Sequence, residues 1–223
     1  MARYLLILTL VGFAVAPALA QPDPLEKEAI EAALKLKGKA AVDIKLEESA
    51  RVSVMLESAT DDTLLTLCKQ PCIGGIIIDD ASKCTEKGYV ALKELPNLQK
   101  LILGKSGVTD KALAAIGSIR PIQLLYLGEA KISDPGLVGI SKMKNLHTLD
   151  LYDSKIGDRG LIHLVGLLKL EELNLSGTKV SDSGIETLKT LVKLKLLRLN
   201  RTEVTRAGVS KLEAELPKAT IRW

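Results

Sequence analysis

Leucine returns along this chain at a fixed interval. Five anchors are each 24 residues apart, namely Leu101, Leu125, Leu149, Leu173 and Leu197. Around each anchor apolar and polar residues alternate, so that Leu149 and Leu151 point one way and Asp150 points the other. This period of two predicts a short strand with one buried face in every repeat.

A second pattern follows each predicted strand. Ser or Thr occupies one column, with Gly157 in its place in one repeat: Thr60, Thr85, Thr109, Ser133, Ser181 and Thr205. An acidic residue comes next in every copy except the last, where Arg206 stands. A helix N-cap followed by a carboxylate in the first turn explains both columns. Apolar residues then recur every three positions, as in Leu161, Leu164 and Leu167, which predicts an amphipathic helix.

Strand and helix in alternation predict a solenoid, because no single repeat can bury its own apolar face. Neighbouring strands lie about 4.8 Å apart and packed helices about 8–10 Å apart, so the sheet must line the inside of an arc. The expected fold class is therefore α/β. We predict a right-handed α/β horseshoe with a parallel sheet on the concave face and helices on the convex face.

The repeat pattern also divides the chain into segments. Residues 1–20 combine Arg3, an apolar run and a small-residue ending at Ala20, which predicts a cleaved signal peptide and an exported, periplasmic or secreted protein. Residues 21–51 should form an N-terminal cap, with a helix over 24–37 and a strand over 41–46. About seven repeats of 24–25 residues then occupy 52–223, and a last edge strand at 219–223 should place Trp223 over the end of the core.

Composition adds limits to this picture. Aromatic residues are only 3% of the chain, so aliphatic side chains must supply the core. With 31 basic and 27 acidic residues the net charge is +4, which gives no general affinity for nucleic acid. We expect no cofactor, and a monomer.

The aligned copies, LxxLxLxxTxVTDxGLxxLxxLxxL, resemble the ribonuclease-inhibitor-like class of leucine-rich-repeat proteins, especially short exported bacterial members. The same repeat resembles the repeat region of F-box leucine-rich-repeat adaptors, although residues 24–46 are short for an F-box. The resemblance covers nearly the whole chain after residue 20. It implies a leucine-rich-repeat solenoid and a protein partner of unknown identity.

Candidate binding residues lie on the outward positions of the predicted strands and just after them. Tyrosines beside charged and amide groups are typical of interaction hot spots. The proposed patch comprises Tyr126, Glu129, Asp150, Tyr152, Asp153, Asn174, Arg198 and Arg201. An ordinary solvated sheet surface is the competing interpretation.

The last repeats offer a second candidate surface, because they are rich in basic residues: Lys189, Lys193, Lys195, Arg198, Arg201, Arg206 and Lys211. Such a surface could attract an envelope glycan or another anionic polymer. Solvated outer faces of repeat helices account for most of these side chains equally well.

The sequence gives little support for a catalytic site or a metal site. His147, Asp150 and Ser154 include the residue types of a hydrolase triad, but they follow one strand in line and cannot converge on one point. We therefore predict a protein that is not an enzyme and binds no metal.

The remaining candidates are modifications. Cys68 and Cys72 are close enough in sequence to form a disulfide in an exported protein, while Cys84 aligns with a core position. The repeat pattern also generates N-glycosylation sequons at Asn174 and Asn200.

Overall fold

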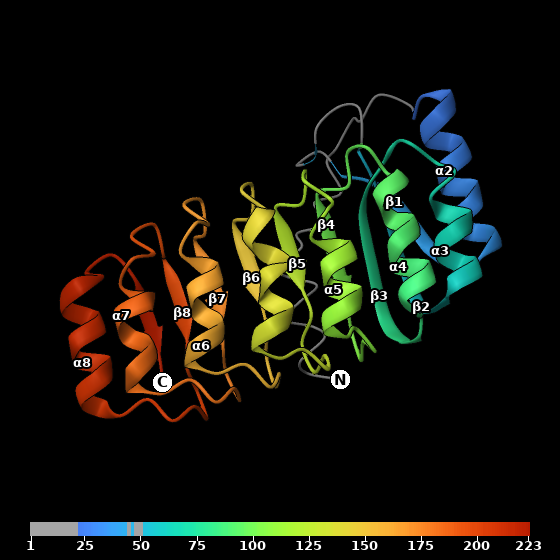
Figure 1. Cartoon of the computed structure of the whole chain (residues 1–223). Coiled ribbons are helices and arrows are strands. Elements are labelled where there is room, and N and C mark those ends of the chain that lie inside the picture. The colour runs from blue at the N-terminus through green and yellow to red at the C-terminus, as the bar shows by residue number, and fades with distance from the viewer. Residues whose placement is uncertain (1–21, 44–45, 47–50) are drawn as a thin grey trace.

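The computed structural model describes residues 22–43, 46 and 51–223, so the predicted signal peptide lies outside the described residues. Within them, nine strands form one sheet in sequence order (Figure 1). The strands are β1 (Lys39–Val42), β2 (Val52–Thr60), β3 (Ile73–Lys83), β4 (Lys100–Leu103), β5 (Leu124–Tyr126), β6 (Thr148–Asp150), β7 (Glu172–Asn174), β8 (Leu196–Arg198) and β9 (Thr220–Arg222).

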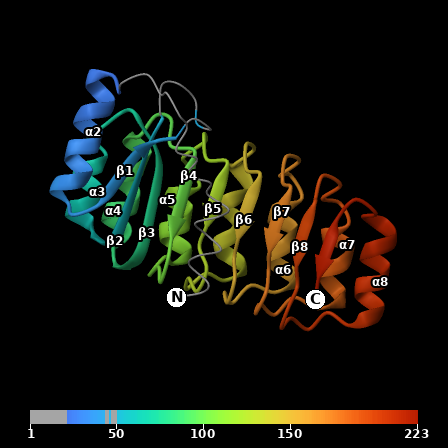
Figure 2. The ribbon, with the colours of Figure 1, turned by 180° about the vertical axis from the view of Figure 1, so that it is seen from behind.

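Helices cover one side of this sheet, and the view from behind exposes the strands (Figure 2). The α-helices are α2 (Pro24–Lys35), α3 (Asp61–Leu67), α4 (Glu86–Ala91), α5 (Asp110–Ile116), α6 (Asp158–Leu161), α7 (Ile185–Leu188) and α8 (Arg206–Glu215). The 3-10 helices are η2 (Leu92–Glu94), η3 (Asp134–Val138), η4 (Ile140–Lys142), η5 (Ile162–Leu164) and η6 (Asp182–Gly184). The predicted α/β solenoid, with its parallel sheet on the concave face, is confirmed.

The outer layer departs from the prediction of a regular α-helix in every repeat. One repeat has only η3 and η4 there, and two more combine a four-residue α-helix with a 3-10 helix. Pro135, Gly136 and Gly139 are poor α-helix formers. The apolar period of three matches the 3.0 residues per turn of a 3-10 helix, which buries Leu137 and Ile140 completely.

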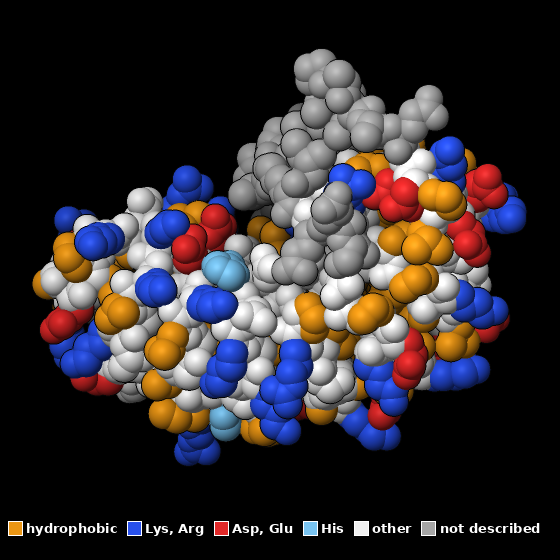
Figure 3. All heavy atoms as spheres, turned by 90° about the horizontal axis from the view of Figure 1, so that it is seen from above, with side chains coloured by type: hydrophobic (Ala, Val, Ile, Leu, Met, Phe, Trp, Pro, Cys, Tyr) orange, Lys and Arg blue, Asp and Glu red, His pale blue; other side chains and the backbone are white. Residues whose placement is uncertain are grey.

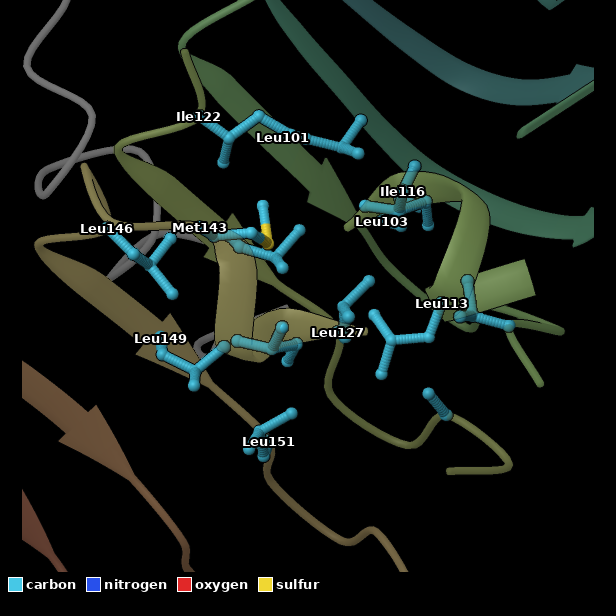
Figure 4. Close-up of a cluster of buried hydrophobic side chains, with 14 of the residues drawn as sticks. Leu101, Leu103, Leu113, Ile116, Ile122, Leu127, Met143, Leu146, Leu149 and Leu151 are labelled. Carbon is cyan, nitrogen blue, oxygen red and sulfur yellow. The ribbon is translucent and has the colours of Figure 1, made fainter. Parts of the chain in front are cut away.

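The register of the strands follows the leucine anchors. Leu101, Leu125, Leu149, Leu173 and Leu197 pair in parallel with one another, and Ile221 of β9 continues the row. All five anchors are fully buried in one continuous core that runs the length of the sheet. Figure 4 shows how the side chains of successive repeats interdigitate in that core. No helix among the described residues is long and apolar enough to cross a membrane.

The two ends of the sheet are built differently. At the first end α2 lies within the range expected for the cap helix, and β1 runs antiparallel to β2. β1 begins at Lys39, earlier than the expected 41–46, because the left-handed backbone of Lys37 and the turn at Gly38 end the helix early. At the other end the Trp223 indole donates a 2.7 Å hydrogen bond to the carbonyl of Val204, while half of its surface stays exposed (50%).

In most repeats an aspartate joins the repeat to the next one. Asp158 accepts hydrogen bonds from the amide (2.8 Å) and the hydroxyl (2.6 Å) of Ser181, which is the N-cap one repeat later. Asp61, Asp110 and Asp182 make the same pair of bonds to Thr85, Ser133 and Thr205. Asp134 accepts only from the amide of Gly157, which has no hydroxyl. The acidic column therefore connects neighbouring repeats, a role that favourable placement at a helix dipole does not imply.

The same carboxylate limits the size of the residue three positions after the next N-cap. A Cβ atom added to Gly160 would lie 2.5 Å from Asp134 Oδ1, and one on Gly184 would lie 2.6 Å from Asp158 Oδ1. The single joint with Glu86 in place of aspartate has Ala112 at this position, and Glu86 turns outward to pair with Lys111 at 2.9 Å. Glycine is thus required where an aspartate reaches in, and alanine fits where none does.

The cysteines do not form the disulfide considered for Cys68 and Cys72. All three thiols are free. Cys68 is the C-cap of α3, whereas the Cys72 thiol donates to the carbonyl of Leu25 in α2 at 3.3 Å. Cys84 is buried, as its core alignment predicts. Burial raises the pKa of Cys68 and of Cys84 to about 11.

We expect Gly160→Ala to lower the free energy of unfolding by about 1–3 kcal/mol, because the added methyl group overpacks against Asp134. The sign is opposite to the gain of about 1 kcal/mol that helix propensity alone predicts. Urea denaturation measures the change. Gly107→Ala is the control, since its Cβ would meet only ordinary contacts at 3.7 Å and beyond. Equal stability of both variants and the parent protein would contradict the fit described for the glycine column.

The Asp182 joint should also respond to pH. The hydroxyl and amide of Thr205 hold the pKa of Asp182 below its ordinary value. A carboxyl group with a lowered folded pKa stabilises the protein above its unfolded pKa, about 3.9, and the contribution disappears as pH falls through the folded pKa. We therefore expect the acid-induced loss of stability below about pH 4 to be shallower in Asp182→Asn. Urea midpoints at several acidic pH values provide the measurement, and parallel curves would contradict it.

Thiol titration of the unfolded, unreduced chain should find all three cysteines. In the folded chain we expect slow alkylation of Cys68 and Cys84, because a thiol with a pKa of about 11 is almost entirely protonated near neutral pH. Detection of only one reactive thiol after denaturation would instead indicate a Cys68–Cys72 bridge.

Candidate interaction surface

The concave face presents two outward columns on the strands β5 to β8, one on each side of the buried anchor. Register places Tyr126 beside Asp150, Asp150 beside Asn174, and Asn174 beside Arg198. These four members of the sequence-predicted patch therefore form one row across β5 to β8. The strands are only three residues long, so each repeat contributes few side chains and the turn that follows supplies the others.

A hydrogen-bonded ladder fixes the middle of this row. Asn174 Nδ2 donates to Asp150 Oδ2 at 2.7 Å. Asp150 Oδ1 in turn accepts from the amide of Tyr152 at 2.9 Å, and Asn174 Oδ1 accepts from the amide of Ser176 at 3.0 Å. Because each side chain also binds the backbone two residues onward, both are held in one orientation.

Tyr152, Asp153 and Arg201 meet across two repeats. Arg201 Nη2 donates to Tyr152 Oη at 2.6 Å, lies 3.4 Å from Asp153 Oδ1, and its guanidinium sits 5.3 Å from the tyrosine ring centre. The repeat between them has Gly177, whose Cβ would collide with Asp153 and lie 3.2 Å from Arg201. The missing side chain at Gly177 therefore lets residues 48 positions apart come into contact.

The turns after the strands share a left-handed backbone. Lys105, Glu129, Asp153 and Arg201 have φ between 42° and 63°, and Gly177 has φ of 75°. Non-glycine residues occupy this region infrequently, so the tight exit turn itself imposes the conformation. Glu129 is exposed on this rim, and its amide donates to the carbonyl of Tyr152.

An apolar cluster adjoins the polar row, and sequence reasoning did not include it in the site. Ile77 and Ile102 are each only 4% exposed, and Met55, Leu124 and Tyr126 pack against them. This cluster is separate from the main core. Its sequence signal was visible, because apolar residues in columns that face away from the core are unexpected on a solvated sheet.

Burial changes the electrostatics at the junction of these two parts. It raises the pKa of Tyr126 to about 12, with Asp150 and Glu172 adding to the effect. The pKa of Asp150 is also raised by burial, although its hydrogen bonds with Tyr152 and Asn174 and the nearby Arg198 oppose the shift. Glu172 Oε2 is buried without a hydrogen-bond partner among the described residues. The centre of the concave face is thus a partly desolvated, acceptor-rich surface.

The basic residues of the last repeats are largely paired. Lys189 and Lys211 both contact Glu186, at 2.6 and 2.7 Å, and Lys195 contacts Glu171 at 2.7 Å. Arg201 is shared between Tyr152 and Asp153. These pairs reduce the net positive charge that the sequence alone suggests for this region.

The triad residue types do not assemble. Ser154 donates its hydroxyl to the carbonyl of Leu151 at 2.7 Å, and Asp150 binds Asn174 and the Tyr152 amide. His147 Nδ1 is buried without a hydrogen-bond partner among the described residues. No group of His, Cys, Asp and Glu side chains in the described ranges could hold a metal ion.

Comparison with known proteins agrees with this architecture. A family model described as Leucine Rich repeat matches residues 142–165 and 167–189, which span β6 and β7. The search of curated proteins returned no match.

Solved structures share the fold at low sequence identity. Internalin C2 of Listeria monocytogenes superposes with a TM-score of 0.60 at 23% identity, over 92% of this chain and 88% of that one. A second internalin of the same bacterium, inlF, gives a TM-score of 0.55 at 18% identity over 95% of this chain. This chain spans 59% of the length of the second structure. The chain therefore contains leucine-rich repeats and shares the fold of these bacterial leucine-rich-repeat structures.

Proposed function

We propose that this chain is an exported, non-enzymatic protein-binding module that engages its partner on the concave sheet. The fold is consistent with a protein-interaction module, and the signal-peptide pattern of residues 1–20 supports export. Eight strands, β2 to β9, at about 4.8 Å give a face nearly 40 Å long. A face of this length accommodates the roughly 800 Å² per partner of a standard interface.

The observation that carries the proposal is the contact between the polar row and the apolar cluster at Tyr126. Hot spots combine aromatic anchors with hydrogen-bonding groups that are already held in place. Tyr126 packs against Ile102, and Asp150 is held by Asn174 and by the amide of Tyr152. The Tyr152 hydroxyl in turn accepts a hydrogen bond from Arg201. Ordering these side chains on binding would therefore cost little conformational entropy.

Two alternatives rank lower. Binding of an envelope glycan or anionic polymer would use the seven basic residues of the last repeats, four of which already contact acidic residues, namely Lys189, Lys195, Arg201 and Lys211. A role as an F-box-type substrate adaptor rests on the repeat resemblance alone. A shared fold carries many functions, so that resemblance does not favour it.

We expect Tyr126→Ala combined with Tyr152→Ala to weaken partner binding at least thirtyfold, because hot-spot truncations cost about 2 kcal/mol or more. The partner is first identified by crosslinking in the native host, and its affinity for the purified protein is then measured by titration.

Tyr126→Phe with Tyr152→Phe is the matched control, since it keeps both rings and should lose less affinity. Circular dichroism must show that both double variants are folded. Unchanged affinity in the alanine double variant would exclude the concave patch as the binding surface.

A further inference from the structure

One edge of the solenoid combines exposed basic and apolar side chains. It is formed by the loops that precede β5, β6, β7 and β8, which are residues 117–123, 143–147, 165–171 and 189–195. We call it the start edge, because the strands begin there. Figure 3 looks onto this edge, where blue Lys and Arg side chains gather over the C-terminal repeats with orange apolar side chains among them.

The loops of the start edge form one connected surface. Asn145 donates to the carbonyl of Arg120 at 3.4 Å, and Lys169 Nζ donates to Asn145 Oδ1 at 2.8 Å. Lys144 Nζ donates to the carbonyl of Gly166 at 3.1 Å. These bonds tie three consecutive loops together and hold the ammonium groups of Lys144 and Lys169 in neighbouring positions.

The positive charge of this edge is not cancelled locally. Lys144 and Lys169 donate to neutral oxygens, and neither they nor Arg120 and Lys193 have an ion-pair partner among the described residues. All four side chains are exposed. The one acidic side chain in these loops, Glu171, contacts Lys195. The pKa of Glu171 is lowered by that hydrogen bond and further by His147 and Lys193.

Two of the most exposed large apolar side chains in the described chain stand on the same edge. Leu168 is 67% exposed and Val192 is 71% exposed, in equivalent positions of neighbouring loops. Each directly precedes a lysine, Lys169 and Lys193. Neither side chain contributes to the core, and the repeat pattern does not require an apolar residue there, since Lys144 occupies the same position one repeat earlier.

We propose that the start edge binds an anionic phospholipid surface, with Arg120, Lys144, Lys169 and Lys193 at the headgroups and Leu168 and Val192 inserted between them. A lipid interface binds both kinds of side chain favourably, because anionic headgroups attract cations and the acyl boundary accepts apolar groups. A soluble polyanion would use only the cations. The apolar pair is therefore the observation that favours a membrane surface over a polymer.

The test is cosedimentation of the full chain with vesicles of phosphatidylcholine, with and without phosphatidylglycerol. We expect binding only to the anionic vesicles. The triple variant Lys144→Gln, Lys169→Gln, Lys193→Gln should lose roughly a hundredfold in affinity, at about 1 kcal/mol per lysine. Its matched control is Lys131→Gln, Lys155→Gln, Lys179→Gln, which removes the same charge from exposed lysines where the strands end and should bind like the parent chain.

The apolar contribution is tested separately. Leu168→Ser with Val192→Ser should weaken binding roughly tenfold, whereas Val138→Ser with Ile162→Ser, which alters exposed residues of the outer layer, should not. Equal losses in the two lysine variants would reduce the effect to bulk charge and overturn the proposal. A second outcome would also overturn it: inorganic polyphosphate competes fully with the vesicles, and the Leu168→Ser, Val192→Ser variant binds like the parent chain. That combination would identify a polyanion site.

Discussion

The inter-repeat carboxylate is the interaction on which the rest of this structure depends. Most contacts in a solenoid join neighbouring units, so its shape is set by how each unit is held against the next. Asp158 reaches from one repeat to the N-cap of the following one and satisfies a backbone amide and a hydroxyl there. The hydrophobic core supplies most of the stability but is nearly uniform along the array. The carboxylates fix where the N-cap of each repeat lies relative to the preceding repeat, which the uniform packing does not specify.

Sequence reasoning recovered the strands because their signal is local and repeated. Leu149 and its equivalents are buried in every copy, and their register follows directly from the 24-residue interval. The nature of the outer layer was harder to predict, since an apolar spacing of three fits both a short amphipathic α-helix and a 3-10 helix. Gly136 does not decide between them, because its equivalents Gly88 and Gly160 lie in α-helices. Gly139, a poor α-helix former, occurs at its position only in the repeat that has 3-10 helices alone.

The positions of the candidate site residues on the sheet were predictable from the sequence, but the contacts among their side chains were less so. Columns read from the repeat placed Tyr126, Asp150, Asn174 and Arg198 side by side, as register requires. The meeting of Tyr152 with Arg201 skips a repeat, so no nearest-neighbour argument could find it. The contact is possible because Gly177, in the repeat between them, has no side chain. That role of Gly177 can be inferred only when the positions of the side chains on both sides are known. The apolar cluster of Ile77 and Ile102 was not predicted, although both residues occupy outward positions of neighbouring strands.

The pairing of aspartate with glycine at the joints also constrains how such an array can diverge. An Asp–Gly joint and a Glu–Ala joint, as at Glu86 and Ala112, are both compatible with the same backbone. Moving from one to the other takes two substitutions, and their order matters. Lengthening the acid first removes the hydrogen bonds to the next N-cap but creates no collision, whereas adding the methyl group first creates one. Mutational paths between the two joints should therefore pass through the intermediate that carries glutamate and glycine.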